Sequence, residues 1–201
     1  MVQELCHEEE KMENTKVSRR KFVGTAAMGA GGLAFFPSAR LFGSETSSMS
    51  AVLKNVWKLS KEYTMDFAQE MPDDKYGFKP TEEVYSYSEQ LLHLVGGNFW
   101  FFSSIKGEKS PKPEDAFGAE GKSKSDVIKL LEESFAYGDE VIEALNDDTA
   151  KEEVAAGQTK LPKWKIVLFC ADHLTHHRGQ MVVYLRLNGI KPPQYRSGYY
   201  G

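Results

Sequence analysis

Four long segments of this chain place apolar residues at three- and four-residue intervals, and this period constrains the fold more than any other feature. The segments cover about 51–71, 86–105, 123–146 and 161–189. Such spacing lines one face of an α-helix with apolar side chains. No run shows the alternation of a half-buried β-strand, and no internal repeat is visible. The period therefore predicts an all-α chain with four helices.

The ends of these segments carry helix signals. Ser86 and Glu89 form a Ser-x-x-Glu capping box, and the third helix is expected to begin near Ser123 or Ser125. In the fourth segment Pro162 suits a first helical turn and Gly189 suits a left-handed cap. The connection at 106–124 is rich in Gly, Pro and charge, so it is expected to be a long crossover loop. These features predict a four-helix bundle with long connections.

Three of the five histidines lie within the fourth segment, in "ADHLTHHRGQMVVYLRLNG". On a helix, His173 and His177 are offset by only about 40° and point the same way. His176 lies about 60° from His173, so it could replace His177 but is not expected to join both. Outside the first 50 residues the remaining histidine is His93, in the second apolar segment. Two helices that both face the core thus hold all of these imidazoles.

Buried imidazoles without a partner are costly, so this clustering favours a bound cation. Two imidazoles are too few for a metal site with one open position, which typically has three protein ligands. His93, His173 and His177 would complete such a set. Three neutral imidazoles suit Zn²⁺, with Ni²⁺ or Fe²⁺ also acceptable by ligand type. The glutamate that follows the first histidine in zincin proteases is absent, as are the common nucleophile motifs.

Several neighbours are candidates for supporting roles. Asp172 could accept an imidazole N–H and orient the ring, or could equally be an outer-face carboxylate. Glu89 lies one turn before His93 and could reach the metal, although capping already explains it. His176 is expected as a neighbour of the site, and Cys170 as a core residue rather than a fourth ligand.

The first 48 residues have the order of a secretory leader rather than of a domain. Arg19 and Arg20 stand in "SRRKF", before a Gly- and Ala-rich apolar stretch and a Ser/Thr linker. The stretch resembles a twin-arginine export signal. We therefore expect a leader and linker at 1–48, a helical domain at 50–196 and a short tail at 197–201. The protein is expected to be exported to the periplasm or another extracytoplasmic space, with a retained membrane anchor as the alternative.

Composition limits the partners of this chain. With 25 basic and 29 acidic residues its formal net charge is −4, and no basic stripe favours nucleic acid. Loss of the leader would remove Cys6 and leave Cys170 without an internal disulfide partner. The expected partners are an unidentified small molecule and the twin-arginine export machinery, with a homodimer left open.

The stretches "FKPTEEVYSYSEQLLHL" and "DHLTHHRGQMVVYLRLNGIKPPQY" resemble the DinB-like (YfiT-like) family of metal-binding bundles. The resemblance covers 51–195, and the HHRGQ run is its most specific part. It implies a bundle of the up-up-down-down type with a metal triad at His93, His173 and His177. Members of that family look mostly cytoplasmic, so the leader is a departure.

The resemblance also implies a reaction class. Family relatives include S-transferases and isomerases that use a low-molecular-weight cytoplasmic thiol, which export would place out of reach. Metal-dependent hydrolysis or a transferase reaction therefore remains the main hypothesis. The alternative is a non-catalytic metal-binding or metal-stabilised module, which the missing nucleophile and general base favour. A purely structural metal would need a fourth protein ligand, and the sequence shows no clear one.

Overall fold

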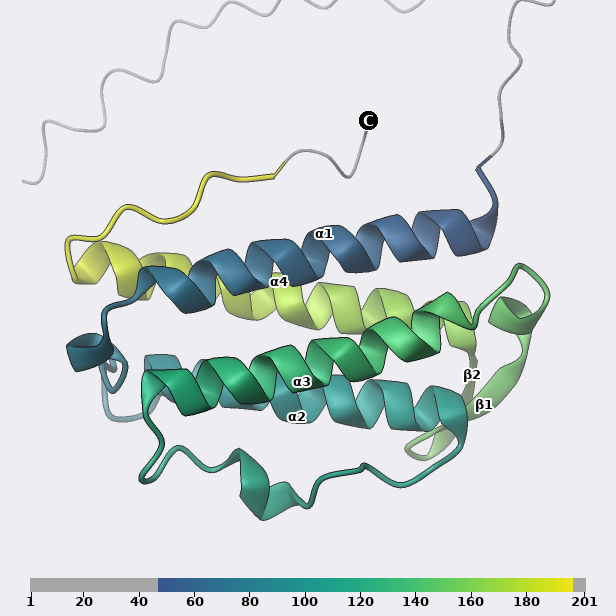
Figure 1. The fold of residues 1–201 in the computed structure, drawn as a ribbon, viewed down its shortest axis with the longest axis horizontal. Coiled ribbons are helices and arrows are strands. Elements are labelled where there is room, and N and C mark those ends of the chain that lie inside the picture. Colours follow the sequence, from purple (N-terminus) through teal and green to yellow (C-terminus); the bar gives the residue numbers. More distant parts are fainter. Residues whose placement is uncertain (1–46, 197–201) are drawn as a thin grey trace, which may run out of the picture. The chain divides into compact units, whose positions relative to one another are not determined.

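The computed structural model describes residues 47–196, which form four long helices and a small β-hairpin (Figure 1). The long helices are α1 (Met49–Glu70), α2 (Tyr87–Lys106), α3 (Lys124–Glu143) and α4 (Lys163–Leu187). Three short 3-10 helices lie in the connections: η1 (Asp73–Lys75), η2 (Glu114–Phe117) and η3 (Thr149–Lys151). The predicted four-helix bundle is confirmed. Arg19, Arg20 and the predicted tail lie outside the described residues.

The helices pack in a non-sequential order. α1 and α2 each pack against α3 and α4, so α1 lies diagonally across from α2. In Figure 1, α1 and α4 run in one direction, and α2 and α3 run in the other. Around the perimeter the helices follow the order α1, α4, α2, α3, so two neighbours run one way and the next two run the other way, an up-up-down-down arrangement. In chain order the directions are instead up, down, down, up. The long connection between α2 and α3 allows these two parallel helices to be neighbours.

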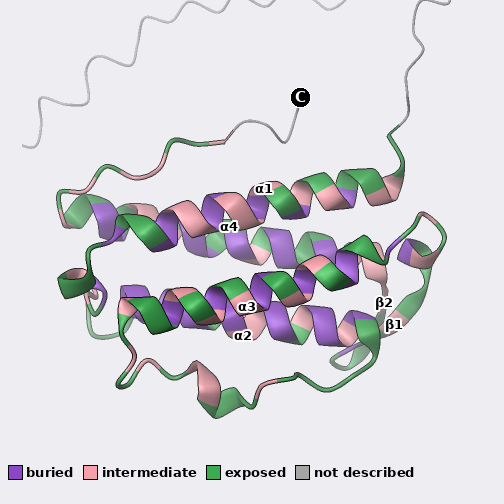
Figure 2. Cartoon of the chain, in the orientation of Figure 1, coloured by how far each residue is buried: buried purple, intermediate pink, exposed green. Residues whose placement is uncertain are grey.

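The core fills the centre of the bundle, and the buried faces of all four helices turn toward it (Figure 2). Its middle is aromatic: the ring centroid of Trp57 lies 4.7 Å from that of Phe102 and 5.3 Å from that of Phe135. Gly138 makes room for this cluster, because a Cβ there would lie 2.4 Å from Cζ2 of Trp57. No helix within 47–196 combines the length and apolarity needed to cross a lipid bilayer.

The helix ends follow their sequence signals closely. Ser86 and Glu89 form the predicted capping box of α2. Ser123 rather than Ser125 caps α3, in a second capping box completed by Asp126. Gly189 has φ of 73°, which confirms the left-handed turn that ends α4.

A two-stranded hairpin corrects the expectation of a chain without strands. β1 (Glu153–Ala156) pairs antiparallel with β2 (Thr159–Pro162) across Gly157, whose φ is 62°. Each strand has four residues and only partial burial, so neither produces a readable alternation. Pro162 consequently ends β2 and precedes α4, instead of occupying its first turn.

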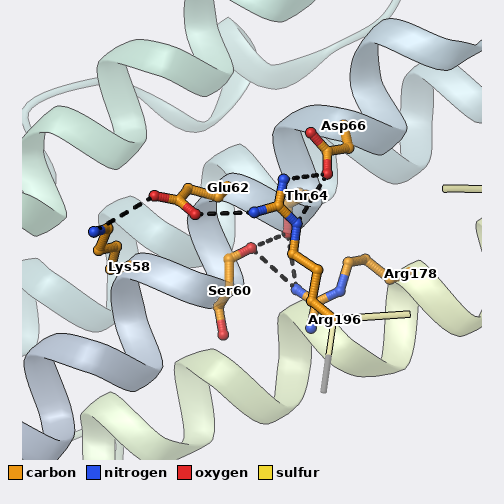
Figure 3. Close-up of polar contacts among 7 residues, drawn as sticks. All are labelled: Lys58, Ser60, Glu62, Thr64, Asp66, Arg178 and Arg196. Atoms are coloured by element: carbon orange, nitrogen blue, oxygen red, sulfur yellow. Dashed lines mark hydrogen bonds and ion pairs between the residues drawn. The ribbon is translucent and has the colours of Figure 1, made fainter. Parts of the chain in front are cut away.

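Two arginines tie the C-terminal part of the chain to α1 (Figure 3). Arg196 donates to Glu62 at 3.0 Å and to Asp66 at 2.6 Å. Arg178, on α4 and buried, donates to the hydroxyl of Thr64 at 2.9 Å. This arrangement gives Arg178 a structural role between α1 and α4.

Candidate metal centre

Three imidazoles meet where α2 packs against α4. His93 comes from α2, and His173 and His177 come from adjacent turns of α4. One possible ligand atom of each residue lies within 4.8 Å of the others. Nε2 of His93 lies 3.0 Å from Nε2 of His173, and the centroids of the His93 and His177 rings are 4.7 Å apart. The structure thus brings together the three histidines that were selected from the sequence.

Gly97 provides the space for this convergence. A Cβ on Gly97 would lie 2.7 Å from Cε1 and 2.9 Å from Nδ1 of His173, closer than real Cβ atoms approach. The His173 ring therefore rests directly on the backbone of α2, one turn after His93. This role was missed from the sequence, although a Gly-Gly pair inside an apolar helix is a signal of close approach. Gly179, within the HHRGQ run, is exposed and meets no such neighbour.

Gln90 orients the most buried of the three imidazoles. Nδ1 of His177 donates to Oε1 of Gln90 at 2.5 Å, which leaves Nε2 of that ring with its lone pair. Gln90 is 2% exposed, and its amide NH₂ donates to Gln180 at 2.7 Å and to Tyr184 at 3.3 Å. A hydrogen-bond acceptor of this kind commonly fixes the tautomer of a metal-binding histidine. In the sequence, the only indication of this role was that Gln90 lies three residues before His93, on the same helix.

The environment keeps the imidazoles uncharged at neutral pH. Burial, reinforced by the neighbouring imidazoles, lowers the pKa of His177 from the ordinary 6.5 to about 3. Burial and the charges of His93 and His176 lower the pKa of His173 to about 4. The pKa of His93 is also lowered, first by burial and then by His176. All three rings can therefore offer a lone pair without first losing a proton.

The remaining candidates surround the site without entering it. His176 is exposed, and its Nε2 accepts from the amide of Gln180 at 2.8 Å. Asp172 is exposed, and its charge makes the smallest contribution to the pKa of His173, in the upward direction. Asp172 is therefore placed as an outer-face carboxylate, and Gln90 has the orienting position for which Asp172 was a candidate.

Glu89 and Cys170 have structural partners. The carboxylate of Glu89 accepts from the backbone N–H of Ser86 at 2.6 Å, which lowers its pKa, although Glu89 also lines the pocket beside His93. Cys170 is buried, its thiol donates to Oδ1 of Asn98 at 3.4 Å, and burial raises its pKa. A thiol held protonated in the core is a poor metal ligand, so Cys170 is a core residue as expected.

The three imidazoles fit a divalent metal ion. They supply three neutral nitrogen donors, a set typical of sites that keep one position open. Nε2 of His173, which faces His93, is the nitrogen of this ring that could bind the ion, whereas its Nδ1 lies beside Gly97. His93 and His173 line a pocket of about 830 Å³, so a ligand can reach their side of the cluster. A group of three histidines at this position could hold a metal ion.

Comparison with known proteins identifies the family and supports the fold. The DinB family matches residues 46–200. The uncharacterized protein YjoA of Bacillus subtilis (strain 168) is 22% identical over 132 residues, which cover 64% of this chain and 84% of YjoA.

Two solved structures have the same fold. A DinB-like protein from Bacillus cereus ATCC 10987 superimposes with a TM-score of 0.65 and 16% identity, over 74% of this chain and 98% of that protein. The DinB-like protein YjoA from Bacillus subtilis gives a TM-score of 0.59 with 21% identity, over 71% of this chain and 95% of YjoA. At these identities the likeness supports the fold.

Proposed function

Because this chain belongs to the DinB family, we propose that it binds one divalent metal ion through His93, His173 and His177. The observation that carries the proposal is the convergence of their ligand atoms within 4.8 Å, from two helices. Zn²⁺ is the ion we propose first, because three imidazoles and an open position suit it, and Ni²⁺ or Fe²⁺ are the alternatives.

We propose that the site serves a metal-dependent hydrolase or transferase, with thiol S-transfer as a narrower form. A divalent ion held by three imidazoles supplies Lewis-acid chemistry to a donor group of the substrate. The protein contributes neutral ligands, a ring orientation fixed by Gln90, and a pocket that opens toward His93 and His173. The three histidines would hold the ion, Gln90 would fix the His177 ring, and the pocket would admit the substrate.

A second candidate is a metal-binding module without turnover. It is favoured by Glu89, the acidic side chain nearest to His93 along α2, because that carboxylate is engaged in the helix cap. Cys170, the one cysteine within 47–196, is likewise engaged in the core. A purely structural metal is disfavoured, because the cluster offers three protein ligands rather than four.

The test is the metal content of the full chain, measured by elemental mass spectrometry after purification without added metal. We expect close to one equivalent of Zn, Ni or Fe, lost in His93→Ala. The matched control is His176→Ala, which removes an exposed imidazole beside the cluster and should leave the metal content unchanged. A folded protein without metal, or equal loss in both variants, would overturn the proposal. Metal-loaded protein would then be screened for hydrolysis and thiol transfer.

We also propose that residues 1–48 direct export through the twin-arginine pathway, on the basis of Arg19 and Arg20 in their sequence context. The test fuses these residues to a reporter protein that folds before transport. Export should be blocked when both arginines are replaced by lysine, and retained when Lys16 is replaced by glutamine. Continued export of the lysine pair would refute the proposal.

A further inference from the structure

The pocket beside the imidazoles has a wall of aromatic side chains. Tyr85, Trp100 and Phe101 come from α2 and the residues just before it, and Phe117 comes from η2 in the following connection. The ring centroid of Tyr85 lies 5.5 Å from that of His93, and that of Phe101 lies 5.8 Å from that of His173. The aromatic wall therefore continues directly from the candidate metal ligands.

Tyr85 and Trp100 are exposed to solvent to an unusual degree for large aromatic residues. Tyr85 and Trp100 are 50% and 49% exposed, although both residues are large and mainly apolar. A contiguous group of accessible aromatic side chains at a concave site is typical of a surface that binds apolar ligand area. The pocket volume of about 830 Å³ is within the range of small-molecule sites.

The loop side of the pocket is held in place by packing. Gly96 accommodates Phe117, because a Cβ at this position would lie 3.1 Å from Cδ2 of that ring. The Phe117 ring also stacks on Phe99, with the centroids 5.9 Å apart and the planes 16° from parallel. Gly96 and Gly97 thus leave space for two neighbouring rings, those of Phe117 and His173 respectively. A ligand would enter a cavity that is already formed.

The charged residues of the wall do not favour an anion. Lys112 is the one basic side chain other than the imidazoles among the described lining residues, and it pairs with Glu133 at 2.7 Å. Two carboxylates, those of Glu89 and Glu114, also line the pocket. Without a bound metal the pocket therefore repels negative charge rather than attracting it.

We infer that this pocket binds an uncharged, largely apolar ligand with an aromatic or aliphatic body, which lies along Tyr85, Trp100 and Phe117. Its electron-pair donor end would point toward His93 and His173, and only this last step rests on the proposed metal function. The body of the ligand is recognised by the aromatic wall itself, with or without a metal ion. Such ligands are the substrate class that the centre would act on.

The test uses N-phenyl-1-naphthylamine, an uncharged dye whose fluorescence increases in apolar surroundings, titrated into the full chain with and without a chelator. We expect micromolar binding in both conditions, weakened at least about tenfold by Trp100→Ala. The matched control is Phe169→Ala. Phe169 is 46% exposed on α4 and is outside the pocket, so its removal should change the affinity less than about twofold. In the chelated protein the sulfonated relative 1-anilinonaphthalene-8-sulfonate should bind more weakly than the uncharged dye.

Absence of dye binding in a chain with normal helical circular dichroism would overturn the inference. Equal loss in both variants, or preference for the sulfonate in chelated protein, would also overturn it. If Trp100→Ala lowers the melting temperature, Tyr85→Ala is the second variant that must show the loss. Metal content is measured on the same samples. If the untreated chain contains no metal but still binds the dye through Trp100, only the metal proposal is refuted, whereas metal without dye binding refutes only the pocket inference.

Discussion

Nε2 of His93 and Nε2 of His173 face each other at 3.0 Å across the contact between α2 and α4. The environment lowers the pKa of both rings, so at neutral pH one must donate a hydrogen and the other must accept it. A divalent ion bound to both Nε2 atoms would replace this hydrogen bond, and the donating ring would then carry its hydrogen on Nδ1 instead. The same contact therefore makes the site sensitive to acid and to the exact separation of the two helices.

The metal-free chain should lose stability as the pH falls from 7 to 5. The pKa values of His173 and His177 are about 4 and about 3 in the folded chain, against an ordinary 6.5. Below pH 6.5 the unfolded chain therefore binds more protons than the folded chain, and acid favours unfolding. We expect the melting temperature to fall by about 5 °C or more in the presence of a chelator. The melting temperature is measured at pH 7 and at pH 5 by monitoring thermal unfolding with circular dichroism.

The variant His177→Gln tests whether His177 contributes to this loss of stability in acid. The substitution removes one titrating ring and retains an N–H that can reach Gln90. Its melting temperature should depend less on pH between 7 and 5 than that of the parent chain. An unchanged slope would show that groups elsewhere cause the acid sensitivity.

Tight metal binding should require glycine at position 97, because a side chain there would clash with His173. Gly97→Ala places a Cβ 2.7 Å from Cε1 of His173, so that ring must shift from its present position against α2. We expect metal affinity to fall about 10- to 100-fold, as for other changes that misorient a ligand. Competition with a chromophoric chelator measures the affinity.

Gly179→Ala is the matched control on α4. A Cβ there meets no atom within 4 Å, so metal affinity should not change. Removing a glycine from a helix interior should raise the free energy of unfolding by about 0.5–1 kcal/mol. Equal losses of metal affinity in the two alanine variants would contradict the steric argument.

The amide oxygen of Gln90 should be needed for tight metal binding. Gln90→Met keeps the shape but removes the acceptor for Nδ1 of His177, and leaves that buried N–H without its partner. We expect a 10- to 100-fold loss of metal affinity and a loss of about 1–3 kcal/mol in the free energy of unfolding. Gln90→Glu retains an acceptor oxygen, so it should bind metal at least ten times more tightly than the methionine variant.

The core should resist enlargement at Gly138, independently of the metal centre. Gly138→Ala forces a Cβ against Trp57 and Phe102, which should lower the free energy of unfolding by about 1–3 kcal/mol. Metal stoichiometry should stay the same, because the ligands come from α2 and α4 while Gly138 lies on α3. Urea unfolding of the chelated protein and elemental analysis of the untreated protein measure the two quantities.

The helices were predictable from sequence because apolar periodicity and caps are local properties. The Ser86–Glu89 box and the turn at Gly189 are each determined by residues a few positions apart. The hairpin at 153–162 was missed, because its strands are short and partly solvated. Their pairing depends on Gly157 and on packing against the helices, which no periodic signal reports.

The metal candidates were predictable for a related reason. The four-residue interval between His173 and His177 ensures that both point the same way once α4 forms. The roles of Gln90 and Gly97 depend on how α2 is rotated and shifted against α4, and one helix's sequence does not determine this. Asp172 was considered because it is adjacent in sequence, whereas the structure selects a residue from the neighbouring helix to hold His177.

The diagonal placement of α1 from α2, and of α3 from α4, has a consequence for how the chain folds. Neither of these consecutive pairs packs side by side, so neither can form a stable helical hairpin by itself. Among the long helices α4 packs against α1 and α2, and these contacts become available only after long stretches of chain have been ordered. The high sequence separation of these contacts should make folding slower than in bundles whose successive helices are neighbours. The α1–α2 segment alone should remain largely unfolded.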